Sequence, residues 1–157
     1  MKLAFLVSGR GTNLKALISA CRSGQVQAEP ALVISDRPQA GALQVAESAA
    51  VANLLINAHD YGSRSEHERA IVKELDRHGI GLVILAGYQR LLSPFLVGYL
   101  YEPRLGQSRI LNIHPADGIR AHEDRYTAAA LALGRVELHQ RVVQRHPPRL
   151  RRENGHA

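Results

Sequence analysis

The stretch KLAFLVSGRGTNL, residues 2–14, decides the fold. Its apolar run at 2–7 predicts a short buried strand, and the Ser-Gly-Arg-Gly run at 8–11 predicts a tight loop. Thr12 or Asn13 can cap the helix that follows. The apolar residues of that helix recur at helical spacing: Leu14, Leu17, Ile18 and Cys21. A buried strand, a glycine-rich loop and a helix are the opening unit of a parallel sheet.

The alternation of strand and helix continues as far as residue 113. The pattern predicts further strands at 31–34, 51–56, 81–86 and 109–113, and further helices at 40–50, from residue 63 and at 91–100. The run at 81–86 is apolar throughout, which is typical of a strand buried on both faces. Ser63, with Glu66 three residues later, is a signature of a helix N-terminus. We therefore expect an α/β fold with a Rossmann-like, doubly wound, mainly parallel sheet.

The composition is that of one globular domain with a basic end. The 157 residues are 45% hydrophobic and 22% charged, values that argue against disorder of the chain as a whole. Residues 1–134 carry 14 Lys and Arg against 12 Asp and Glu, a net +2, whereas residues 135–157 carry 6 Arg against 2 Glu, a net +4. We expect an α/β domain over 1–134 and a basic, irregular tail over 135–157.

The cysteine count and the lengths of the apolar runs indicate the cellular compartment and the kinds of site to expect. The single cysteine, Cys21, excludes an internal disulfide framework and a multi-cysteine zinc site. It also suits a cytoplasmic protein. No run approaches the length of about 18 apolar residues that a membrane span needs. We expect neither a membrane association nor a metal site.

Polar loops follow two of the predicted strands, at the edge where parallel sheets bind ligands. The loop at 8–13 combines glycines with a helix N-terminus, which suits a phosphate; the alternative is a turn with a helix cap. The loop at 87–90 offers free backbone groups at Gly87 and Gln89 for a flat heterocycle, and the Arg90 guanidinium for an anion. Its alternative is a helix entry with a solvated arginine.

A third polar pair ends the last predicted strand. Alternation places Asn112 and His114 on one face of that strand, near its carboxyl end. An amide can stabilise an oxyanion and an imidazole can move a proton near neutral pH, so the pair suits acyl transfer. The alternative is a histidine bonded within the core beside a turn-forming asparagine.

Three motifs together make the chain resemble the phosphoribosylglycinamide formyltransferase (glycinamide ribonucleotide transformylase) family. The motifs are LVSGRGTNL at 6–14, LAGYQRLLSP at 85–94 and LNIHP at 111–115. The resemblance covers residues 1 to about 117 and implies the Rossmann-like formyltransferase fold. It also implies transfer of a formyl group from 10-formyltetrahydrofolate to the amine of glycinamide ribonucleotide in de novo purine synthesis.

The resemblance implies roles for residues at matching positions. Gly11, Thr12 and Asn13 would hold the substrate phosphate. Asn112 would stabilise the tetrahedral oxyanion, and His114 would assist proton movement. The folate site would include Arg64, Gln89, Arg90, Leu91 and Leu92. The formyl folate would be a consumed cosubstrate, and no metal is implied.

The resemblance ends before the chain does. The family carries a catalytic aspartate in a segment resembling Val-x-Asp-x-x-Asp-x-Gly-Pro, where residues 134–140 read GRVELHQ instead. We therefore expect the family's C-terminal strands to be missing. A truncated or degenerate relative, impaired or inactive but retaining its ligand-binding loops, stays open as an alternative.

The sequence also leaves alternative enzyme activities and alternative binding partners to consider. Methionyl-tRNA formyltransferase and formyltetrahydrofolate hydrolase are alternative formyl-folate enzymes, although the loop at 8–13 favours a nucleotide substrate. Nucleic-acid binding by the tail is disfavoured, because residues 144–157 hold no aromatic side chain to stack on bases. We expect small-molecule substrates as partners and leave a homodimer open.

Overall fold

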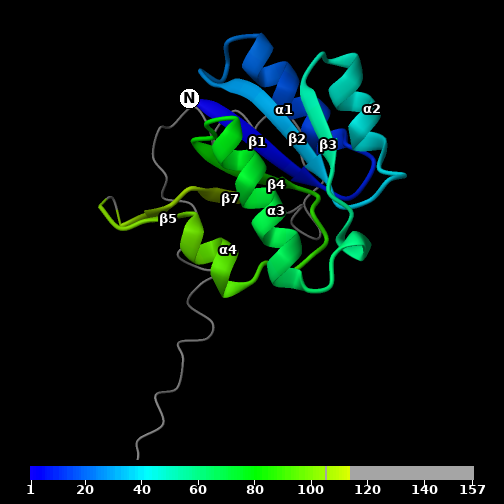
Figure 1. The fold of residues 1–157 in the computed structure, drawn as a ribbon. Helices are drawn as coiled ribbons and strands as arrows, with labels where there is room; N and C mark the ends of the chain where they lie inside the picture. The colour runs from blue at the N-terminus through cyan, green and yellow to red at the C-terminus, as the bar shows by residue number, and fades with distance from the viewer. Residues whose placement is uncertain (105, 114–157) are drawn as a thin grey trace, which may run out of the picture.

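A computed structural model describes residues 1–104 and 106–113 of the chain. Five parallel strands form its main sheet in the order β3-β2-β1-β4-β7 (Figure 1). The strands are β1 (Lys2–Val7), β2 (Glu29–Ser35), β3 (Ala52–Leu55), β4 (Leu82–Ala86) and β7 (Ile110–Ile113). Because β2 and β3 lie on one side of β1 and β4 and β7 on the other, the strand order reverses between β1 and β4. The doubly wound, parallel sheet predicted from the sequence is confirmed.

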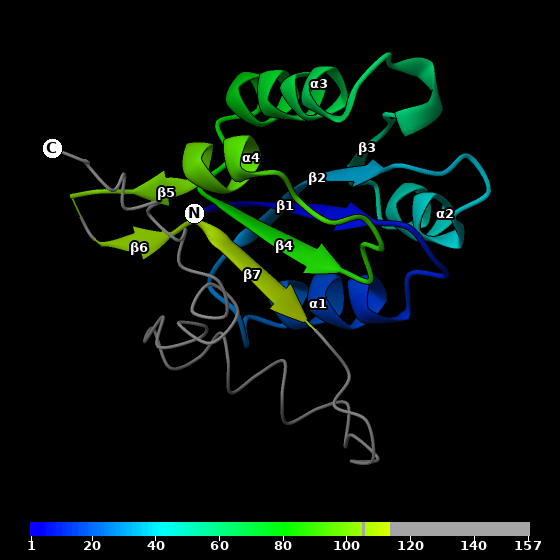
Figure 2. The ribbon, with the colours of Figure 1, turned by 90° about the horizontal axis from the view of Figure 1, so that it is seen from below.

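Two helical layers cover the sheet, one on each face. The helices of the main fold are α1 (Thr12–Arg22), α2 (Gly41–Ser48), α3 (Arg64–Arg77) and α4 (Pro94–Tyr99). Alternate residues of β1 serve the two layers: Phe5 packs in the core under α1 and α2, and Leu6 packs in the core under α3 and α4. Figure 2 shows α3 and α4 on the face opposite α1.

The inner strand β4, between β1 and β7, is buried along its whole length. All five of its residues are buried, with Ile84 in the core under α1 and Leu85 in the core under α3. This confirms the prediction of a strand covered on both faces. Its neighbours are β1 and β7, so the carboxyl ends of β1, β4 and β7 lie side by side at one edge of the sheet.

Helix starts follow the local sequence with two differences. Ser63 caps α3, since its hydroxyl accepts from the Glu66 N–H at 3.2 Å. The Glu66 carboxylate, however, accepts from Gly62 N at 2.9 Å. The helix predicted within 91–100, with Ser93-Pro94 at its start, is α4: it begins at Pro94 with Ser93 as its N-cap, and residues 91 and 92 lie before it. Proline disfavours helical geometry in the residue before it, and that restriction fixes the boundary.

Short elements were missed by the sequence patterns. A 3₁₀ turn, η1 (Ala58–Asp60), follows β3, and a two-stranded hairpin, β5 (Tyr101–Glu102) with β6 (Gln107–Ser108), precedes β7. Strands of two residues are too short to show an alternation. The predicted domain boundary between 134 and 135 lies outside the described residues. No helix in the described part of the chain has the length and apolar character needed to cross a membrane.

Candidate functional site

The loop after β1 is held in shape by the start of α2. Gly11 has φ +87°, and a Cβ added there would lie 2.7 Å from Ala42 Cα. Ala42 N donates to Gly9 O at 3.1 Å. The loop therefore packs backbone against backbone on α2, and only glycine fits at position 11 in both conformation and space.

The start of α1 leaves its first backbone N–H groups available. The prediction that Thr12 or Asn13 caps this helix is wrong: Gly11 is the N-cap, and no side chain accepts a hydrogen bond there. Gly11 O instead accepts from Lys15 N at 2.8 Å. The first turn contains no acidic residue. N–H groups without helical partners, together with the helix dipole, suit an anion at this point.

The segment after β4 is tied to the loop after β1. Gln89 N donates to the Ser8 hydroxyl at 3.0 Å, although the two residues are 81 positions apart. Ser8 itself is buried. Between Gln89 and the start of α4, the Leu91 side chain is 80% exposed.

Arg64 and Asn112 lie on the same side of the sheet as that segment. Arg64 is the first residue of α3, one turn before Glu68, whose carboxylate bonds to Ser93. Asn112 lies in β7, in register with Leu85, and is exposed. Its neighbours Leu111 and Ile113 pack toward α1, so alternation directs the Asn112 side chain to the face of α3 and α4. His114 lies outside the described residues.

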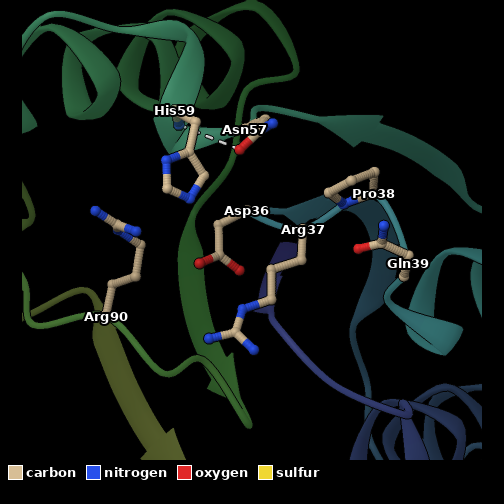
Figure 3. A pocket seen from close by; sticks show the side chains of 7 residues that line it. All are labelled: Asp36, Arg37, Pro38, Gln39, Asn57, His59 and Arg90. Carbon is tan, nitrogen blue, oxygen red and sulfur yellow. Dashed lines mark hydrogen bonds between the residues drawn. The ribbon is translucent and has the colours of Figure 1, made fainter.

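An open pocket that the sequence reasoning missed adjoins Arg90. It has a volume of about 310 Å³. Its lining residues follow β2, β3 and β4: Asp36, Arg37, Pro38, Gln39, Asn57, His59 and Arg90. Figure 3 shows the Asp36 carboxylate between the side chains of Arg90 and Arg37. The position of Asp36 directly after the second predicted strand was the signal that could have found it.

Asp36 is the most deeply buried charge of this pocket. It is 4% exposed, and its Oδ1 has no hydrogen-bond partner among the described residues. Asn57 Oδ1, on the pocket wall, accepts from His59 N at 3.2 Å. The described residues contain no group of three or more His, Cys, Asp and Glu side chains arranged to hold a metal ion.

Tyr88 connects the pocket with the segment after β4. Burial raises the pKa of its hydroxyl well above the ordinary value. The Asp36 and Glu68 carboxylates raise this pKa further, while the Arg90 guanidinium lowers it. Tyr88 therefore stays neutral across the physiological range and lies within the electrostatic influence of three charged residues.

Alkaline pH should weaken the fold through Tyr88. The unfolded chain releases this proton near pH 10, whereas the folded chain keeps it, so stability is fully present below pH 10 and falls above it. One such group contributes a slope of at most about 1.4 kcal/mol per pH unit. Tyr88→Phe should reduce the loss of stability between about pH 10 and 11.5, measured by urea unfolding. An unchanged slope would contradict the burial of an un-ionised hydroxyl.

Comparison with known proteins shows that the chain is similar to formyl transferases. The formyl transferase family model matches residues 1–130. Phosphoribosylglycinamide formyltransferase of Escherichia coli is 34% identical over 116 residues, covering 74% of this chain and 52% of the relative. The Haemophilus influenzae enzyme of that name is 36% identical, over 73% of this chain and 51% of the relative. The chain thus spans about half the length of the curated relatives it matches.

Solved structures agree with the sequence relatives. Glycinamide ribonucleotide transformylase 1 from Symbiobacterium toebii superposes with a TM-score of 0.66 at 39% identity, over 73% of this chain and 51% of that one. Phosphoribosylglycinamide formyltransferase from Coxiella burnetii gives 0.67 at 31% identity, over 85% of this chain and 60% of that one.

Proposed function

The chain belongs to the formyl transferase family, and on that premise we propose that it transfers a formyl group from 10-formyltetrahydrofolate to the amine of glycinamide ribonucleotide in purine synthesis. The names of its relatives support the substrates. The observation that carries the proposal is the Ser8–Gln89 hydrogen bond. This bond ties the loop that leads into α1 to the segment after β4, which supports two substrate sites next to each other.

The proposal divides the substrates between the two loops. The phosphate of the nucleotide is held at the start of α1 by Gly11, Thr12 and Asn13, where free N–H groups and the helix dipole favour negative charge. The folate lies along the segment after β4 and the first turn of α3. Its proposed contacts are Arg64, Gln89, Arg90, Leu91 and Leu92.

The proposed chemistry is an acyl transfer. The amine nitrogen attacks the formyl carbon, a C–N bond forms, and the carbonyl oxygen becomes an oxyanion in the tetrahedral intermediate. The Asn112 amide donates a hydrogen bond to that oxyanion. His114 accepts the proton of the attacking amine and returns a proton to the departing folate nitrogen as its bond to the formyl carbon breaks. The folate leaves as tetrahydrofolate and is therefore a cosubstrate.

The surroundings of the reaction belong to the same proposal. Both partners of the chain are small molecules, and the reaction runs in the cytoplasm, where the lone Cys21 would stay reduced. In this proposal the α/β domain over 1–134 supplies the loops; residues 135–157, which carry 6 Arg against 2 Glu, lie outside the described residues.

An assay with three acceptors tests the proposal. The purified chain is incubated with 10-formyltetrahydrofolate and, in separate reactions, with glycinamide ribonucleotide, with methionyl-tRNA or with buffer alone. We expect formylation of the nucleotide above the level of the heat-denatured chain. Formyl transfer only to methionyl-tRNA, or release of formate in buffer, would replace the proposed substrate by one of the other formyl-folate activities. No transfer by the folded chain to any acceptor would overturn the proposed activity.

A further inference from the structure

Glu68 is a buried carboxylate that the proposed reaction does not use. It lies in α3, is 2% exposed, and forms no ion pair among the described residues. A buried charge without a counterion is costly unless hydrogen bonds satisfy it. Both Glu68 oxygens accept from one residue: Oε1 from Ser93 N at 2.8 Å, and Oε2 from the Ser93 hydroxyl.

Ser93 ends the segment that carries the proposed folate contacts. Its hydroxyl also accepts from Leu96 N at 3.5 Å and so caps α4. At the other end of the segment, Gln89 N is bound by Ser8. Residues 89–93 are therefore tied to the loop after β1 at one end and to α3 at the other. Arg90, Leu91 and Leu92 lie between these two attachments.

We propose that Glu68 is a positioning residue for the folate site: its carboxylate holds the backbone of residues 89–93 in the conformation that the cosubstrate binds. This inference rests on the proposed function. The packing of α3 against α4 does not depend on Glu68 alone. The Arg69 guanidinium also lies over the Phe95 ring, 5.4 Å from its centroid, and joins the two helices. A buried carboxylate whose two oxygens both bond to one serine is better explained by a need to fix the backbone of residues 89–93 than by helix packing.

The effect should be confined to the folate. The proposed phosphate loop rests on α2, where Gly11 meets Ala42 on the opposite side of the sheet from α3. Among the described residues, the hydrogen bonds of the Glu68 carboxylate end at Ser93, four residues from Gln89, where the segment meets that loop. A change at Glu68 should therefore alter the affinity for the folate and leave the affinity for the nucleotide as it was.

Glu68→Gln is the informative substitution, because it keeps the shape and removes the charge. Its single oxygen can still accept from Ser93 N, but its amide group then faces a hydroxyl that needs an acceptor. Glu68→Asp keeps the charge and should restore part of the loss. Glu66→Gln is the matched control, since Glu66 lies on the same helix and its carboxylate accepts only at the surface, from Gly62.

Calorimetry on the full chain gives the decisive comparison, with 10-formyltetrahydrofolate and glycinamide ribonucleotide titrated separately. We expect Glu68→Gln to raise the Kd of the folate about tenfold, the effect of one weakened charge-assisted hydrogen bond. The Kd of the nucleotide should stay within twofold of the parent. The urea midpoint should fall, because the weakened hydrogen bond lies inside the fold, so both Kd values are measured on chains shown to be folded at zero urea. Amide exchange of residues 87–93 should quicken in Glu68→Gln and not in Glu66→Gln.

The outcomes separate the two claims. Folate binding that Glu68→Gln leaves unchanged, or an equal loss for both ligands, overturns the positioning role alone. A parent chain that binds the nucleotide and not the folate, or neither, overturns the proposed function and this inference with it. In a double-mutant cycle, Ser93→Ala should add little to Glu68→Gln; full additivity would also count against the inference.

Discussion

Asn112→Ala is expected to slow formyl transfer by about 10²- to 10³-fold, the usual cost of removing one oxyanion donor. Asn112 is exposed on β7 and lies beside Leu85 of the neighbouring strand β4. In the proposed role, the strand would hold the amide where charge develops, so the lost interaction would belong to the transition state. The change should appear in kcat, measured at saturating concentrations of both substrates, and the KM values should move little.

The control for this prediction is another asparagine of the same sheet. Asn53 is exposed on β3, the strand at the opposite edge, and its amide donates to Val51 O at 3.3 Å. Asn53→Ala should leave kcat unchanged. If both variants slow the reaction equally, the effect comes from the sheet and not from an oxyanion contact. If Asn112→Ala keeps the parent rate, the assigned role of Asn112 is wrong.

Gly11→Ala is expected to destabilise the fold by about 3 kcal/mol. Two causes add together. The φ of +87° is unfavourable for alanine, and the new methyl group would lie 2.7 Å from Ala42 Cα. The obstacle is backbone, so α2 or the loop must move. Urea unfolding measures the loss, and calorimetry should show weaker binding of glycinamide ribonucleotide in the folded fraction.

Gly24→Ala separates the two causes. Gly24 follows α1 with φ +77°, and a Cβ there would meet nothing within 4 Å. Gly24→Ala should lower the free energy of unfolding only by the cost of the positive φ, about 1 kcal/mol. An equal loss for the two variants would show that the contact between the loop and α2 contributes nothing.

The family resemblance drawn from three motifs is confirmed by the match of the formyl transferase family model. The motifs could be recognised because each combines backbone requirements with chemistry in a short stretch. Gly11 is such a case: its φ and its contact with Ala42 both demand glycine. The roles of Gly11, Thr12, Asn13, Asn112 and His114 in the reaction remain predictions, as do those of the folate-site residues.

Strand and helix order could be read from the sequence by itself. The apolar runs at 2–7 and 81–86 became β1 and β4 because a parallel sheet buries such strands on both faces. The periodicity of apolar residues is a local property, so it can be recognised in a short stretch without knowing where the rest of the chain lies. The cap of α3 at Ser63 followed from the same local chemistry.

Only the tertiary structure decided how distant residues meet. Ser8 and Gln89, Glu68 and Ser93, and the pocket of Asp36 with Arg90 each join segments far apart in sequence. No pattern in a single sequence reports a hydrogen bond between side chains and backbone across 25 or 81 positions. These contacts depend on strand order, which sets β4 beside β1 and brings their loops together. The sequence by itself determined the elements and their chemistry, and the packing of the sheet determined which of them share a site.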